Sequence, residues 1–73
     1  MSSLPVLSGR EVVKVLASFG WEVARQNGSH IIMTKEGEMV TLSVPDHREV
    51  ARGTLRGLIR AANLTVDEFV AAI

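Results

Sequence analysis

The chain has 73 residues, no cysteine, two histidines, and eight basic side chains against eight acidic ones. This length predicts a single domain, residues 1–73, with a thin core, because a domain of this size buries only about 60% of its unfolded surface. The composition excludes a disulfide, a thiolate nucleophile and a cysteine-based zinc site, and a net charge of zero gives no overall attraction to nucleic acid.

The sequence also argues against a membrane, secreted or metal-binding protein. No apolar run approaches the roughly 20 residues that a membrane helix needs. The N-terminal segment MSSLPVLSGR lacks the basic and apolar regions of a secretory signal. Two histidines and scattered carboxylates offer few ligands for a dedicated metal site. We therefore expect a cytoplasmic protein without a cofactor, a metal or a membrane segment.

The first predicted element is a helix in the segment SGREVVKVLASFG. Ser8 can cap its first turn, and Glu11 follows at the spacing of a capping box. Gly20 ends the helix, as a left-handed glycine commonly does. The apolar face repeats at the helical period and consists of Val12, Val13, Leu16 and Phe19.

The apolar period changes from helical to two-residue at Trp21, which predicts strands. The segment WEVARQ is expected to place Trp21, Val23 and Arg25 on one side of the first strand. The Asn27-Gly28 pair that follows is a strong hairpin signal, because both residues tolerate positive φ. The segment HIIMT then forms the second strand.

A third strand, MVTLSV, is predicted after a turn centred on Gly37. It is expected to span residues 39–44 and to end at Pro45, since proline interrupts a strand ladder. One face of this strand is expected to carry Val40, Leu42 and Val44.

Two helices follow a polar connection. The first, TLRGLIRAAN, is expected to start near Gly53 and Thr54 and to stop at Asn63 in a left-handed conformation. The second, TVDEFVAAI, has a capping box at Thr65 and Glu68. The apolar stripe of the first helix comprises Leu55, Leu58, Ile59 and Ala62. The residues that the second helix is expected to bury are Val66, Phe69, Val70 and Ile73.

This order of elements predicts an α+β fold of the form α-β-β-β-α(-α). A three-stranded antiparallel meander is marginally stable by itself, so the helices must cover one face of the sheet. The expected architecture is therefore a two-layer sandwich with the helices on one face.

Arginines recur every four residues in the second half of the chain, at Arg48, Arg52, Arg56 and Arg60. Where this stretch is helical they lie along one ridge, and Arg52 is expected at its mouth. Guanidinium groups of such a ridge match phosphate oxygens and could follow a nucleic-acid backbone. The alternative is a solvated helix face whose charge is partnered by Glu49 and water.

His30 stands between a predicted turn and three apolar residues, in the segment NGSHIIM. It is either incidental to a solvated turn or a group that moves protons, since imidazole titrates near pH 6.5. Ile32 must face the opposite side of the sheet from Ile31 and Met33, and HIIM fits both registers. One of these sets is therefore exposed or covered, either by a partner protein or a second copy of the chain, or in part by the helices. His47, in a polar loop, has no role that the sequence assigns.

Several segments together resemble the HicA toxin family of small bacterial mRNA interferases. The similarity covers LSGREVVKVLASFGWEVARQNGSHIIM and VPDHREVARGTLRGLIRAANLTVDEF, from Leu7 to about Phe69. Its most specific pieces are GSH at residues 28–30, VPDH at residues 44–47 and GTLRGLIRAANLT from Gly53. The resemblance implies a fold like that of the double-stranded-RNA-binding domain.

The resemblance implies a toxin that cleaves mRNA, halts translation under stress and is inhibited by a HicB-type antitoxin. The catalytic histidine of the family is that of the GSH motif, which is His30 here. RNA brings its own nucleophile, the ribose 2′-OH, so such an endoribonuclease needs neither cysteine nor metal. His30 would act as the general base or as the general acid, and the sequence leaves both roles open. The residues expected to contact RNA are Gly28, Ser29, Lys14, Arg25, Arg52, Thr54 and Arg56.

Two other functions fit the same features. A non-catalytic RNA-binding module would use the arginines and leave RNA intact, with a salt-dependent affinity. A protein-interaction adaptor would use an apolar sheet face alone.

Overall fold

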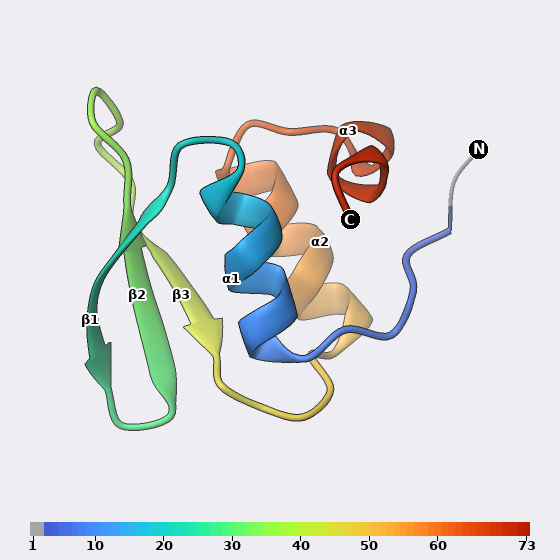
Figure 1. Ribbon diagram of the computed structural model, residues 1–73, viewed down its shortest axis with the longest axis horizontal. Helices are drawn as coiled ribbons and strands as arrows, with labels where there is room; N and C mark the ends of the chain where they lie inside the picture. Colours follow the sequence, from blue (N-terminus) through green and yellow to red (C-terminus); the bar gives the residue numbers. More distant parts are fainter. Residues whose placement is uncertain (1–2) are drawn as a thin grey trace.

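The computed structural model describes residues 3–73, which form a three-stranded sheet and three helices (Figure 1). The elements in chain order are α1 (Gly9–Ala17), β1 (Glu22–Asn27), β2 (His30–Thr34), β3 (Leu42–Pro45), α2 (Arg52–Ala61) and α3 (Val66–Ala71). The sheet is antiparallel with the strand order β1-β2-β3, and α1 and α2 cover one of its faces. The predicted two-layer α+β architecture is confirmed. Within residues 3–73, no helix is long and apolar enough to span a membrane.

Two of the three helices begin with the predicted capping boxes. At α1, the backbone N–H of Glu11 donates to Ser8 Oγ at 3.1 Å, and the backbone N–H of Ser8 donates to Glu11 Oε1 at 2.9 Å. At α3, Thr65 and Glu68 form the same pair of bonds, at 3.1 and 2.8 Å. Each box satisfies backbone donors that a helix start leaves without a partner.

The start of α2 differs from the sequence prediction. The helix begins at Arg52, before the expected Gly53 and Thr54, and its N-cap residue Ala51 makes no side-chain hydrogen bond. A tertiary contact holds this point instead: the buried Val50 donates its backbone N–H to the carbonyl of Leu7, N to O 2.8 Å. The other end is as predicted, because Asn63 adopts φ 62° just after α2.

The β1–β2 hairpin turns one residue later than the Asn27-Gly28 signal suggested. Asn27 pairs with His30, so Gly28 and Ser29 form a two-residue loop. Gly28 has φ 62°, whereas Asn27 does not have positive φ. Glycine at the first loop position is typical of a type II′ turn. Because a slip of one residue inverts every side chain of a strand, this turn decides which face His30 occupies.

A β-bulge in β1 breaks the predicted alternation. Val23 pairs with Met33 and Arg25 pairs with Ile32, so Ala24 is the extra residue between them. Val23 and Arg25 were expected on one side of the strand, and that prediction is wrong. The bulge turns Arg25 to the face of the sheet that also carries Ile32.

β3 is shorter than predicted and lies further along the chain. It spans Leu42–Pro45, whereas Met39 and Val40 are exposed and precede it. The reason is that β2 ends at Thr34, which leaves residues 39 and 40 no strand to pair with. Pro45 is the last residue of β3 and lies opposite His30.

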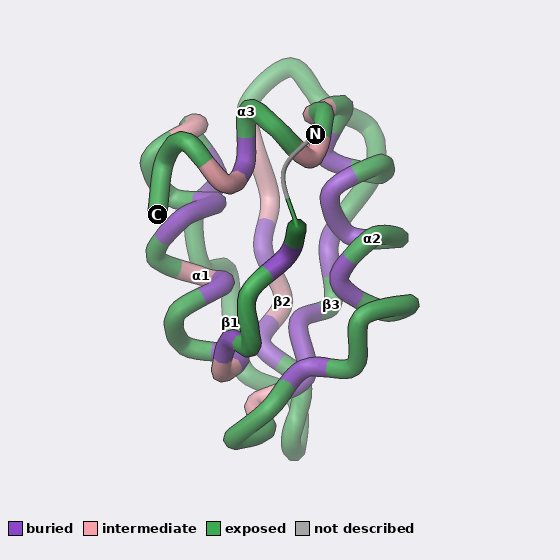
Figure 2. Tube along the Cα trace, turned by 90° about the vertical axis from the view of Figure 1, so that its right-hand side faces the viewer, coloured by how far each residue is buried: buried purple, intermediate pink, exposed green. Residues whose placement is uncertain are grey.

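The core lies between the sheet and the helices (Figure 2). Ile31 and Met33 of β2 are buried in it with Leu42 and Val44 of β3, so the helices cover this set and Ile32 belongs to the open face. The helices contribute Val12, Val15 and Leu16 from α1, Leu55, Leu58 and Ile59 from α2, and Phe69 from α3. Ile73 was expected in the core but is 58% exposed, because α3 ends at Ala71 and the last residues lie beyond it.

Candidate functional site at the hairpin end

Three segments that are distant in the sequence meet at one end of the molecule, the lower end in Figure 1. They are the β1–β2 turn, the start of α1 and the loop from β3 to α2. We call this region, comprising residues 9–10, 25–30 and 45–52, the hairpin end. The β2–β3 turn lies at the opposite end of the sheet (Figure 1).

His30 opens β2 at the hairpin end and is exposed. Its neighbour Ile31 is buried against the helices, so His30 belongs with Ile32 to the open face. Gly28 and Ser29, which precede it, are exposed as well. A substrate can therefore reach the imidazole without displacing any element of the fold.

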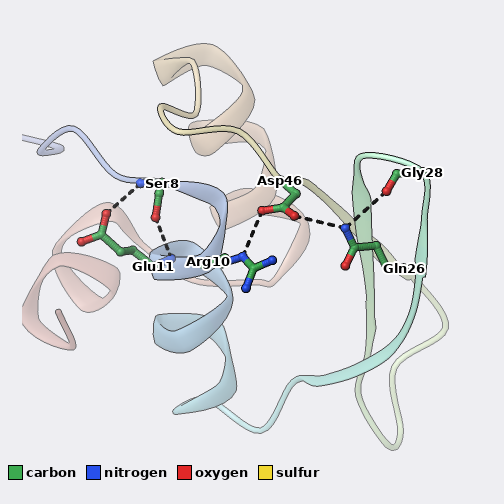
Figure 3. Close-up of polar contacts among 6 residues, drawn as sticks. All are labelled: Ser8, Arg10, Glu11, Gln26, Gly28 and Asp46. Carbon is green, nitrogen blue, oxygen red and sulfur yellow. Dashed lines mark hydrogen bonds and ion pairs between the residues drawn. The ribbon is translucent and has the colours of Figure 1, made fainter.

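A polar cluster of three side chains links the segments of the hairpin end (Figure 3). Asp46 accepts from Arg10 Nε on Oδ1 at 3.4 Å and from Gln26 Nε2 on Oδ2 at 3.1 Å. Gln26 Nε2 also donates to the carbonyl of Gly28, at 3.3 Å. The Asp46 side chain is only 21% exposed, while that of Arg10 is 79% exposed. The cluster thus ties α1, β1, the turn and the β3–α2 loop to one another.

Backbone hydrogen bonds hold the same segments together. The N–H of Asp46 donates to the carbonyl of Ser29, N to O 2.6 Å, and the N–H of Gly9 donates to the carbonyl of His47, N to O 2.9 Å. Gly9 is buried, and a Cβ added to it would overlap the carbonyl oxygen of Pro45. The absence of a side chain at this position therefore allows α1 to approach the end of β3 closely.

Several arginines surround the hairpin end. Arg25 lies on the open face with His30, as the bulge dictates. Arg52 is the first residue of α2 and Arg56 follows one turn later, and both are exposed with Thr54. Arg48 lies in the loop, outside the helix, so the ridge of α2 comprises Arg52, Arg56 and Arg60.

In the alternative of a solvated ridge, the partners of the arginines were Glu49 and water; Glu49 forms no ion pair with the ridge among residues 3–73. Among residues 3–73, neither Arg52, Arg56 nor Arg60 has a carboxylate within ion-pair distance. Their guanidinium groups are exposed and open to an anionic ligand.

Lys14 lies away from the hairpin end. It lies in the last turn of α1 and lines a shallow groove of about 270 Å³ with Glu11, Val15 and the C-terminal residues Ala72 and Ile73. That groove is on the side of α1 that faces the chain end, whereas His30 is on the open face of the sheet. The hairpin end therefore contains the candidates Arg25, Gly28, Ser29, His30 and Arg52. Thr54 and Arg56 lie further along α2, in the helix layer, and Lys14 lies in the groove beside the chain end.

The neutral net charge conceals a separation of charge. Glu36 and Glu38 lie in the β2–β3 turn, at the end opposite the hairpin end, and Asp67 and Glu68 lie in α3. The hairpin end instead gathers most of the arginines, namely Arg10, Arg25, Arg48 and Arg52, with Asp46 and Glu49 as the acidic residues among them. A local basic surface can attract an anion even though the whole chain is neutral.

Sequence reasoning missed the residues that position the site. Arg10, Gln26 and Asp46 carry no periodic or motif signal that would pair them, because 20 and 36 residues separate the bonded partners. Gly9 is the first residue of a helix with a clear cap, and its close contact with Pro45 depends on the tertiary fold.

Comparisons with known proteins identify the family of this chain. Residues 9–64 match the family model described as the HicA toxin of bacterial toxin–antitoxin systems. A chain in a solved toxin–antitoxin complex from Streptococcus pneumoniae is 37% identical, with a TM-score of 0.71 over 80% of this chain and 98% of that chain. No curated protein matches the sequence. Since the family model covers most of the chain, including the hairpin end, the protein belongs to the HicA toxin family.

Proposed function

We propose that this toxin is an endoribonuclease that cleaves mRNA, with His30 as a catalytic residue. The observation that carries the proposal is the position of His30: an exposed imidazole on the open sheet face, at the end of the molecule where unpaired arginines gather. Imidazole is the side chain best suited to proton transfer near neutral pH. The arginines supply the positive charge that a phosphodiester requires.

The reaction needs no nucleophile from the protein. The ribose 2′-OH attacks the adjacent phosphorus, the 5′-oxygen leaves, and the products are a 2′,3′-cyclic phosphate and a 5′-hydroxyl. The protein has to move protons and stabilise the additional negative charge on the phosphorane. His30 performs one of the two proton transfers. A single positioned imidazole contributes about 10² to 10⁴-fold to the rate.

The RNA path that best fits the geometry crosses the hairpin end. Gly28 and Ser29 form an exposed turn without bulky side chains, so the backbone of the substrate can come close. Arg25 on the open face lies beside His30 and is suited to the scissile phosphate or its neighbour. Arg52, Thr54 and Arg56 hold a flanking phosphate at the start of α2. Lys14 contacts only RNA that continues past this surface along α1.

A HicB-type antitoxin is the proposed protein partner. Its support is the similarity to a chain from a toxin–antitoxin complex. An inhibitor that occupies the open sheet face would cover His30 and Arg25 together and so exclude RNA. The proposed site of action is the cytoplasm, where mRNA is translated.

The decisive experiment is cleavage of a defined mRNA in EDTA by the wild type and by His30→Ala. We expect the wild type to produce 2′,3′-cyclic phosphate ends, and the variant to be slower by about 10² to 10⁴-fold. Because His30 is exposed, the variant should unfold at the wild-type temperature. Ser43→Ala is the matched control, since Ser43 is an exposed residue of the same face, opposite Ile32.

Other outcomes identify other functions. Equal cleavage by His30→Ala and the wild type would exclude the catalytic role of His30. RNA that is bound in a salt-dependent manner but stays intact would favour a non-catalytic RNA-binding module, which the unpaired arginines also support.

A further inference from the structure

The fold brings the main chain at the second histidine close to that of the first. His30 pairs with Pro45, and the ladder between β2 and β3 ends at this pair. Beyond it, a hydrogen bond from the N–H of Asp46 to the carbonyl of Ser29 still joins the two segments, N to O 2.6 Å. Ser29 precedes His30 and Asp46 precedes His47, so this bond brings the main chains of the two histidines together.

The main chain fixes the position of His47 and leaves its side chain available. Its carbonyl accepts the N–H of Gly9, N to O 2.9 Å, and Gly9 is buried at the start of α1. His47 is exposed, and within residues 3–73 its imidazole has no hydrogen-bond or ion-pair partner. The structural contribution of this residue therefore comes from its backbone, which any other residue would retain.

We propose that His47 is a second catalytic residue and that the two histidines divide the proton transfers of RNA cleavage between them. This inference rests on the ribonuclease activity proposed above. One imidazole takes the proton of the 2′-OH as the O2′–P bond forms. The other, as an imidazolium, gives its proton to the 5′-oxygen as the P–O5′ bond breaks. The protons balance, and neither water nor another reactant is consumed in this step.

The placement of the two residues suits this task. The attacking and leaving oxygens stand on opposite sides of the phosphorus in an in-line displacement, so the two proton carriers must lie on either side of one phosphate. His30 and His47 are both exposed and belong to segments that a backbone hydrogen bond joins, so both imidazoles are available to one bound phosphate. The chain contains no cysteine and no tyrosine, and imidazole is in general the side chain best suited to proton transfer near neutral pH.

The charged groups around His47 come from every segment of the hairpin end. Its own loop contributes Asp46, Arg48 and Glu49, and α2 begins with Arg52. The start of α1 contributes Arg10, which pairs with Asp46. β2 contributes His30 itself. Carboxylates and guanidinium groups therefore both belong to the surroundings of His47, and the test measures the pH dependence of the reaction itself.

The test is the pH profile of kcat/KM for cleavage of a short RNA by the wild type, His47→Ala and His47→Gln. We expect a bell-shaped profile for the wild type, and a loss of about 10² to 10⁴-fold in both variants with one side of the bell removed. Glu49→Ala is the matched control, because Glu49 is an exposed residue of the same loop. Its bell shape should persist. The thermal midpoints of the variants should stay within the error of the wild type, since the backbone bond to Gly9 is retained.

A substrate with sulfur in place of the bridging 5′-oxygen then assigns the two roles. Sulfur leaves without a proton, so this substrate should restore cleavage by the variant that lacks the acid, either His47→Ala or His30→Ala. Restoration of neither, or an unchanged bell-shaped profile in His47→Ala, would overturn the proposal while leaving the ribonuclease assignment intact. A wild type that cleaves no RNA would overturn both.

Discussion

The starts of α1 and α2 lie at the same end of the molecule but are built differently. α1 begins with a complete capping box, an acidic residue in its first turn and a buried glycine packed against β3. α2 begins with Ala51, which caps nothing, and with the exposed Arg52. A capping side chain contributes about 1 kcal/mol to stability, and a cation near the positive end of the helix dipole costs about 0.3–1 kcal/mol.

This difference between the two helix starts shows where the protein forgoes local stability. Uncapped backbone N–H groups and an arginine at the start of α2 are unfavourable by themselves, yet both favour a bound anion such as a phosphate. Local rules of this kind are commonly broken at functional sites. The start of α1 therefore serves the fold, and the start of α2 serves the proposed RNA contact.

The largest expected effect concerns the glycine at the start of α1. Gly9→Ala should destabilise the fold by about 2–3 kcal/mol, because the new Cβ meets the backbone of Pro45 and Asp46, which cannot move away as a flexible side chain could. The control is Gly57→Ala in α2, where the added Cβ has nothing within 4 Å. It should stabilise the protein by about 0.5–1 kcal/mol, the usual helical preference for alanine. Urea denaturation measures both, and a stable Gly9→Ala would contradict the close packing.

A cap introduced into α2 should make its start resemble that of α1. Ala51→Ser and Ala51→Asp should each stabilise the protein by about 1 kcal/mol, since either side chain can accept a backbone N–H of the first turn. Only the aspartate adds a negative charge where phosphate is proposed to bind. We therefore expect weaker RNA binding for Ala51→Asp and unchanged binding for Ala51→Ser. Equal affinities of the two variants would argue against a phosphate at this helix start.

The arginine at the start of α2 can be tested by its salt dependence. Arg52→Ala should weaken RNA binding and reduce the slope of log K against log salt by about 0.7, the value for one phosphate contact with single-stranded nucleic acid. Arg60→Ala is the matched control, because Arg60 belongs to the same ridge but lies in the last turn of α2. Binding titrations at several salt concentrations measure both slopes. Identical slopes for the two variants would place the RNA elsewhere.

The smallest effect is a pH dependence of stability that originates at α1. Hydrogen bonds from the backbone and side chain of Ser8 lower the pKa of Glu11 below its ordinary value of 4.5. The carboxylate therefore contributes stability that is present above pH 4.5 and is lost as the pH falls through the lower pKa of the folded state. Glu11→Gln should show a weaker loss of stability in acid than the wild type, as measured by urea denaturation between pH 3 and 6. Parallel curves for the two proteins would show that the carboxylate contributes no pH dependence.

Local interactions made several parts of the fold predictable from the sequence. The two capping boxes join residues three positions apart, so Ser8 with Glu11 and Thr65 with Glu68 could be recognised directly. The stop at Asn63 follows from the tolerance of asparagine for positive φ. His30 and Arg52 were named as site residues from the motif resemblance and the four-residue arginine repeat, and these assignments remain predictions.

Other features of the fold depend on contacts between residues far apart in the sequence, and only the tertiary structure determined them. Pairing with β2 determines the bulge at Ala24, which turns Arg25 to the face of His30. The bond between Val50 and Leu7 holds the loop just before α2. The links from Asp46 to Arg10 and to Gln26 join residues 36 and 20 positions apart. No local pattern encodes such contacts, because they stabilise the chain only after the sheet and the helices have packed together. The hydrogen bond from Asp46 to Ser29, which joins the segments of His47 and His30, is also a consequence of that packing.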